Sequence, residues 1–204
     1  QSLGKLSGQV AGWADGSVAA GGVKAGRALG NLPPTEDNIE GPFYRPNAPM
    51  STRLFEAGDK GESVTVTGRV LDTDGKPVAG ALLDIWLANS KGEYDIDSPN
   101  DRGNASIPLK WRGRMRTDGY GNYRYEAILP GQYEIGENKW RPKHIHAKVS
   151  ASGRRPLTTQ MYFAGDSFNE SDTWWKPSLT TPLTPAGQGA FVSSFDFVLK
   201  RQAP

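Results

Sequence analysis

Apolar and polar residues alternate with a period of two over several stretches of the chain. Val64 and Val66 alternate with polar neighbours, which is the pattern of a half-buried β-strand. The same period recurs in three further stretches, residues 123–126, 144–149 and 191–199. In the last of these, Phe195, Phe197 and Leu199 are expected to share one face of a strand. The pattern therefore predicts at least four strands.

Residues 81–88 form an apolar run that only Asp84 interrupts, which is typical of a strand covered on both faces. Turn sequences separate the predicted strands: Asp74-Gly75, Asp118-Gly119 and Pro130-Gly131. Only residues 54–57 and the Trp174-Trp175 region are expected to contain short helices. We therefore predict an all-β fold, a β-sandwich of mixed or antiparallel sheets with long loops.

Residues 1–40 differ from the rest of the chain. Gly, Ala and Ser dominate residues 12–30, and Pro33-Pro34 follows. Because this segment has too few large apolar residues to make a core, we expect an irregular N-terminal arm. The arm would pack on the domain or on a neighbouring subunit, and in the second case the protein would be a homo-oligomer. Residues 41–204 are expected to form a single domain.

Composition narrows the classes of function. The 204 residues include 24 Lys and Arg against 22 Asp and Glu, a formal net charge of +2, which excludes a polycationic nucleic-acid binder. No apolar run approaches the roughly 18 residues of a membrane-spanning helix, so no membrane partner is expected. The absence of cysteine excludes disulfides and Cys-ligated metal centres. A start at Gln1 without an initiator Met fits export after removal of a signal, and it fits the cytoplasm equally.

Both histidines of the chain lie in one tripeptide, His144-Ile145-His146. On a strand, the two imidazoles point to the same face and Ile145 points into the opposite layer. Such a pair is a natural chelate for Zn, Cu, Fe or Ni. The alternative is a pair of surface or cross-strand histidines without a metal.

Further ligands for this pair must come from elsewhere in the chain. Residues 147–153 offer none, and cysteine is absent, so carboxylates or phenolates are the candidates. Tyr94 and Tyr133 stand at the ends of predicted turns. A phenol ionises near pH 10 in water, so it binds a metal at neutral pH only beside a strong Lewis acid such as Fe(III). Taken alone, each tyrosine is better explained as a ring that covers the edge of the core.

An ordered set of motifs carries more information than any single one. The motifs are IEGPFY at 39–44, GRV at 68–70, IWLAN at 85–89, GEY at 92–94, TDG at 117–119, PGQY at 130–133, RPKHIH at 141–146 and LTTQ at 157–160. Together they resemble the intradiol ring-cleavage dioxygenases over residues 39–166. The short stretch from Tyr133 to Arg141 is more similar to the protocatechuate 3,4-dioxygenases than to the catechol 1,2-dioxygenases.

The resemblance implies a site and a reaction. It implies a non-haem Fe(III) held by two tyrosinates and two imidazoles: Tyr94, Tyr133, His144 and His146. It implies that Tyr133 is the labile ligand, which leaves the iron and takes a proton when substrate binds. It places Arg141 and Gln160 beside a catecholic substrate. The implied reaction cleaves the ring between its two hydroxylated carbons with O2 and gives a cis,cis-muconate-type product.

Three points stay open at this stage. The substrate is not ranked, because Ile135 stands where a protocatechuate enzyme often has an aromatic residue. Arg141 is also compatible with a surface position stacked on Trp140. The GRV, DG and PGQY motifs additionally resemble transthyretin-like or carboxypeptidase-regulatory sandwich modules, which bind or adhere without catalysis. That alternative leaves the His-Ile-His tripeptide and the LTTQ run unexplained.

Overall fold

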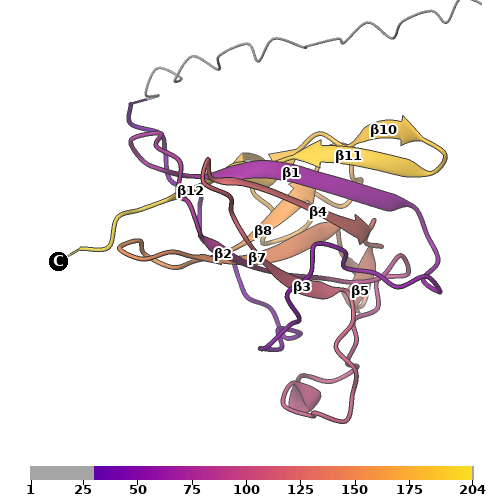
Figure 1. Cartoon of the computed structure of the whole chain (residues 1–204). Coiled ribbons are helices and arrows are strands. Elements are labelled where there is room, and N and C mark those ends of the chain that lie inside the picture. Colours follow the sequence, from indigo (N-terminus) through magenta and orange to yellow (C-terminus); the bar gives the residue numbers. More distant parts are fainter. Residues whose placement is uncertain (1–29, 204) are drawn as a thin grey trace, which may run out of the picture.

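Two five-stranded sheets pack against each other, and the structure, a computed structural model, describes residues 30–203 (Figure 1). The first sheet consists of β1 (Ser63–Asp72), β4 (Asn122–Ile128), β10 (Thr184–Gly187), β11 (Ala190–Ser194) and β12 (Phe197–Leu199). The second has the order β3 (Arg112–Arg116), β2 (Leu82–Leu87), β7 (His144–Ser150), β8 (Leu157–Phe163) and β9 (Thr180–Thr181). A separate hairpin contains β5 (Tyr133–Gly136) and β6 (Lys139–Arg141).

The sheets are mixed, as predicted. β1 is antiparallel to β4 but parallel to both β11 and β12. Neither of the two short helices expected from the sequence forms at its predicted position. Residues 54–57 form no helix, and the Trp174-Trp175 region is a turn that precedes the short 3₁₀ helix η2 (Pro177–Leu179). A second 3₁₀ helix, η1 (Pro99–Asp101), lies in the long connection between β2 and β3. The all-β sandwich with long loops is therefore confirmed.

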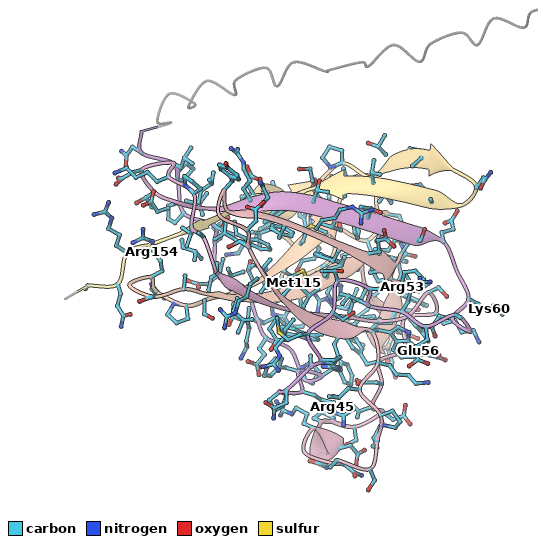
Figure 2. All side chains as sticks on the ribbon, viewed as in Figure 1. Arg45, Arg53, Glu56, Lys60, Met115 and Arg154 are labelled. Atoms are coloured by element: carbon cyan, nitrogen blue, oxygen red, sulfur yellow. The ribbon has the colours of Figure 1, made fainter. Side chains whose placement is uncertain are left out.

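The core fills the space between the two sheets. Val64 and Val66 of β1 are fully buried, as their alternation predicts. Ile145 of β7 is 1% exposed and belongs to the same core cluster. Met115 of β3 lies between the layers as well (Figure 2). The period-two pattern thus identified the inward face of both sheets.

The Asp74-Gly75 turn forms, but it does not make a regular hairpin. The Gly75 amide donates to the Asp72 carbonyl at 2.9 Å, and Leu71 makes an isolated bridge with Pro77. The next strand, β2, pairs with β3 and β7 in the other sheet. The turn therefore carries the chain from one layer to the other.

Residues 191–199, predicted as one strand, are split into β11 and β12. Between the two strands, the Arg69 amide donates to Asp196 Oδ1 at 2.8 Å, and the Tyr123 hydroxyl donates to the Phe195 carbonyl at 2.5 Å. A Cβ atom on Gly68 would lie only 1.8 Å from that carbonyl, so the break requires a glycine at this position. Phe195 still packs in the core, as do Phe197 and Leu199 of β12.

The described part of the N-terminal arm packs on its own domain. The Leu32 amide donates to Thr73, the Thr35 amide to Val198 and the Asn38 amide to Thr158, at 2.7–3.0 Å. The rest of the predicted arm, residues 1–29, lies outside the described residues, so its association with a second subunit stays a prediction. Within residues 30–203, no helix is long and apolar enough to cross a membrane.

The outer face of the second sheet carries a second, smaller apolar cluster. Trp86, Ala88 and Tyr94 are buried there, and Phe43, Tyr44 and Tyr133 pack against them. The N-terminal segment, the β2–β3 connection and the β5–β6 hairpin cover this face. It is therefore a protected compartment outside the main core.

Ile145 provides a test of this two-sided strand. Replacing it with Ala should lower the free energy of unfolding by about 2–5 kcal/mol, because a fully buried side chain leaves a cavity between the sheets. The matched variant Ile135→Ala, at a side chain that is 48% exposed, should change it by less than about 0.5 kcal/mol. Chemical denaturation of both variants measures the difference, and equal losses would contradict the assignment of Ile145 to the core.

Candidate active site

The two histidines lie on β7 with their rings on the covered outer face. Both are 2% exposed, and Ile145 between them faces the core. The His144 Nδ1 atom donates to the Pro142 carbonyl at 2.7 Å, which leaves its Nε2 lone pair free to accept or to bind a metal. Burial, reinforced by the charge of Arg141, lowers the pKa of both imidazoles well below the usual value. Both rings are therefore neutral, the form that a metal ligand requires.

Trp86 of β2 holds the second imidazole in place. Its ring stacks on His146 with 4.8 Å between centroids and 9° between planes. Trp86 is fully buried and also packs against Tyr44, with 4.8 Å between ring centroids. The orientation of His146 is thus set by the neighbouring strand.

Tyr94 and Tyr133 reach the histidines from two separate loops that touch through their backbones. The Gly131 amide donates to the Asn89 carbonyl at 2.8 Å. A Cβ on Gly92 would lie 2.4 Å from the Gln132 carbonyl oxygen, and a Cβ on Gly131 would lie 2.5 Å from that of Ser90. The glycines of the GEY and PGQY motifs therefore allow the two tyrosine-bearing loops to approach each other closely.

Four donor atoms converge at one point. The Tyr94 Oη lies 3.5 Å from His144 Nε2 and 3.2 Å from His146 Nε2, and the Tyr133 Oη lies 3.3 Å from His144 Nε2. The family resemblance assigned these four residues to one site, and the structure brings them together.

This donor set fits a trivalent metal ion. Metal bonds to imidazole nitrogen and to oxygen are about 2.0–2.2 Å long, so neighbouring ligand atoms lie about 3.0–3.5 Å apart, close to the contacts seen here. Burial raises the pKa of both phenols, so they ionise only beside a strong Lewis acid. Within the described part of the chain, no group of three or more His, Cys, Asp or Glu could hold a metal instead.

Arg141 is buried, and the alternative of a surface arginine stacked on Trp140 is wrong. Its Nε atom lies 3.1 Å from Asp172 Oδ1, and its Nη2 donates to Gln160 Oε1 at 2.6 Å. The guanidinium carbon lies 4.8 Å from the centre of the Trp174 ring, whereas Trp140 stacks on Phe168. The partners of Arg141 come instead from later segments of the chain.

Gln160 lies on β8 directly opposite His146 and is fully buried. Its amide nitrogen donates to the Ile39 carbonyl at 2.9 Å, while its oxygen accepts from Arg141 and from the Tyr162 hydroxyl. Gln160 thus lies behind Arg141 and fixes its position.

Asp166, which the sequence analysis did not single out, connects the two ligand-bearing segments. Its Oδ1 accepts from Gln132 Nε2 at 2.7 Å, next to Tyr133, and its Oδ2 accepts from the Lys143 amide at 3.0 Å, next to His144. No periodic pattern marks this carboxylate in the sequence. The only indication in the sequence is that Asp166 lies shortly after the strand that contains the LTTQ motif.

A buried ion cluster stabilises the loop that carries Tyr94. Asp95 Oδ2 accepts from Arg45 Nη1 at 3.0 Å and from Arg112 Nε at 2.9 Å. Arg45 also donates to four carbonyls of the β2–β3 connection: Arg102, Asn104, Ile107 and Pro108. Figure 2 shows Arg45 beside this connection, which projects from the sandwich. Arg45 therefore anchors the loop and does not line the site.

A cavity of about 620 Å³ lies over the donor cluster. Tyr94, Tyr133 and Arg141 line its inner part, together with Phe43 and Trp174. Trp174, which the sequence analysis assigned to no functional role, both lines the cavity and covers the Arg141 guanidinium. The cavity is therefore large enough for a substituted aromatic ring that contacts both phenols and the Arg141 guanidinium.

Comparison with known proteins agrees with this geometry. Residues 39–200 match the protein family described as dioxygenase (Dioxygenase_C). The chain is 32% identical to the chlorocatechol 1,2-dioxygenase of Rhodococcus opacus over 192 residues, which cover 81% of this chain and 72% of the relative. It is 37% identical to the catechol 1,2-dioxygenase of Acinetobacter baylyi over 162 residues, which cover 71% of this chain and 51% of the relative.

A solved structure extends the comparison to the fold. The dioxygenase domain of a dioxygenase–carbohydrate-binding protein fusion from Streptomyces sp. SirexAA-E superimposes with a TM-score of 0.72 at 35% identity, covering 83% of this chain and 100% of that one. The chain therefore belongs to the intradiol ring-cleavage dioxygenases, a family of oxidoreductases of aromatic-compound catabolism.

Proposed function

We propose that this protein is a non-haem Fe(III)-dependent intradiol dioxygenase that opens the ring of a catechol between its two hydroxylated carbons. Both atoms of O2 enter the product, a cis,cis-muconate-type diacid. The observation that carries the proposal is the convergence of two phenol oxygens and two neutral imidazole nitrogens within 3.2–3.5 Å under a cavity. Family members generally depend on non-haem iron. The non-catalytic sandwich alternative leaves this buried donor cluster without a purpose.

In this proposal Tyr94, Tyr133, His144 and His146 hold the iron. When bound, Fe(III) supplies the Lewis acidity that favours the ionised catechol and makes its ring reactive towards O2. His144 and His146 act as neutral donors, because burial keeps them unprotonated. Tyr94 is the more buried phenol, at 7% exposure, and lies within hydrogen-bond distance of both imidazoles, which suits a permanent ligand.

Tyr133 suits the role of labile ligand and base. It is half-buried, lines the cavity, and begins the short β5–β6 hairpin outside both main sheets. A catechol that enters the cavity meets its Oη, which takes one substrate proton when the hydroxyl ionises. The base is thus supplied by the site itself, without a separate carboxylate.

Arg141 supplies a fixed positive charge at the inner end of the cavity. Asp172, Gln160 and the Tyr162 hydroxyl hold it from behind. Negative charge that develops on the ring during oxidation is stabilised by a preorganised cation more strongly than by water. Gln160 and Asp172 are positioning residues in this scheme, since both act through Arg141.

Iron content gives the first test. Protein prepared with iron should bind one Fe(III) per chain and absorb visible light by tyrosinate-to-metal charge transfer. His146→Ala removes one of two imidazoles and should lose most of the iron, measured by elemental analysis and by the visible band. A colourless protein that contains its full complement of iron would contradict the four-ligand assignment.

Tyr133→Phe separates the labile ligand from the others. The variant should retain iron but show a changed charge-transfer band, and its kcat/KM for catechol should fall about 10²-fold because the proton acceptor is lost. Tyr120→Phe, at a ring that is 78% exposed, should change neither quantity. Full activity in Tyr133→Phe would remove the proposed role.

Asp172→Asn tests the support of Arg141. The substitution keeps the shape but removes the charge that pairs with the guanidinium, and kcat should fall about tenfold while the iron band is unchanged. The control Glu126→Gln removes a carboxylate from an exposed pair with Arg124 and should leave kcat unchanged. Loss of the iron band in Asp172→Asn would show that its role is structural.

A further inference from the structure

The outer part of the cavity is lined by negatively charged side chains. A catechol bound at Tyr94 and Tyr133 directs its hydroxyls inwards, so a substituent on the far side of the ring must extend towards the mouth. Ile135, a cavity-lining side chain that is 48% exposed, lies on this outer side. Three carboxylates line it as well: Glu93, Asp97 and Glu134.

These carboxylates come from two segments of the chain. Glu93 and Asp97 lie in the β2–β3 connection, on either side of Tyr94, and Glu134 follows Tyr133 in β5. Each side chain is exposed at the surface of the cavity. A substituent that emerges between the two ligand-bearing loops therefore meets negative charge from both.

No cation neutralises the three carboxylates among residues 30–203. Glu93 accepts from the Asn89 amide group and Glu134 from the Asn138 backbone, both at 2.9 Å, and both donors are neutral. Within the described chain none of the three forms an ion pair.

Arg141 is the one basic residue that lines the cavity within that same part of the chain, and it is paired with Asp172. Lys91 and Lys139 are close in sequence to the carboxylates, but neither lines the cavity. The mouth therefore carries excess negative charge in front of a cationic inner end.

We propose that this site selects catechols by the charge of their ring substituent: it favours an amine-bearing, cationic substituent and disfavours a carboxylate. The inference rests on the proposed function, because it describes the substrate of that reaction. A protonated amine gains Coulomb energy from the three carboxylates, whereas a carboxylate is repelled by all of them. The carboxylates are solvated, so the selection is moderate and weakens with salt.

Three catechols of nearly equal size isolate the effect of charge. They are 4-(2-aminoethyl)catechol, 4-ethylcatechol and 3,4-dihydroxyphenylacetic acid, with catechol itself as the reference. Oxygen uptake by the iron-loaded protein gives kcat/KM for each at low and high salt. We expect the cationic compound to exceed the anionic one by about tenfold at low salt, with the neutral compound between them. Added salt should bring the ratio of these two kcat/KM values closer to one.

The triple variant Glu93→Gln/Asp97→Asn/Glu134→Gln should bring the ratio of kcat/KM for the cationic compound to kcat/KM for the anionic compound close to one, with each value taken relative to unsubstituted catechol. The matched control Asp37→Asn/Asp74→Asn/Glu126→Gln removes three carboxylates that do not line the cavity, and it should keep the ratio of the unmodified protein. A ratio that the first variant leaves unchanged overturns the inference, as does equal cleavage of the cationic and anionic compounds. Failure to cleave any of the four compounds, catechol included, overturns the proposed function and this inference with it.

Discussion

Two phenol oxygens and two imidazole nitrogens can meet only if two loops and one strand approach within hydrogen-bond distance of each other. The strand presents His144 and His146 together because side chains alternate along it. The loops come close enough because Gly92 and Gly131 have no side chains, and any Cβ at these positions would overlap a backbone carbonyl. The donor cluster, the cavity above it and the proposed chemistry all depend on this backbone contact.

The sandwich makes the contact possible by using both faces of its second sheet. The inner face, with Ile145, completes the main core, and the outer face supports a second apolar cluster around Trp86 and Tyr94. This second cluster keeps the histidines neutral and raises the pKa of both phenols. Burial therefore favours the uncharged form of all four side chains, so the phenols ionise only beside a strongly charged cation such as a trivalent metal ion. The buried ions around it, such as Asp95 with Arg45 and Arg112, are all paired.

Much of this architecture could be predicted from the sequence, since its signals are local. Alternation identified β1, β4 and β7, and the spacing of two within His144-Ile145-His146 placed both imidazoles on one face. The convergence with Tyr94 and Tyr133 was predicted only through the family resemblance.

Local signals could not predict contacts between segments that are distant in the sequence. The break between β11 and β12 follows from Gly68, which no pattern near residue 195 reveals. The neighbours of Arg141 are Gln160, Asp172 and Trp174, which lie 19 or more residues further along the chain. No local signal could therefore exclude the alternative of stacking on the adjacent Trp140.

The pairing of β5 with β6 has a mechanical consequence. Tyr133 and Arg141 are directly opposed in this two-stranded ribbon, and the ribbon is joined to neither of the large sheets. A tilt of the ribbon would displace the Tyr133 hydroxyl, a proposed metal ligand, together with the Arg141 guanidinium. Insertions or substitutions at its tip, around residues 136–139, would therefore shift two groups of the proposed site at the same time.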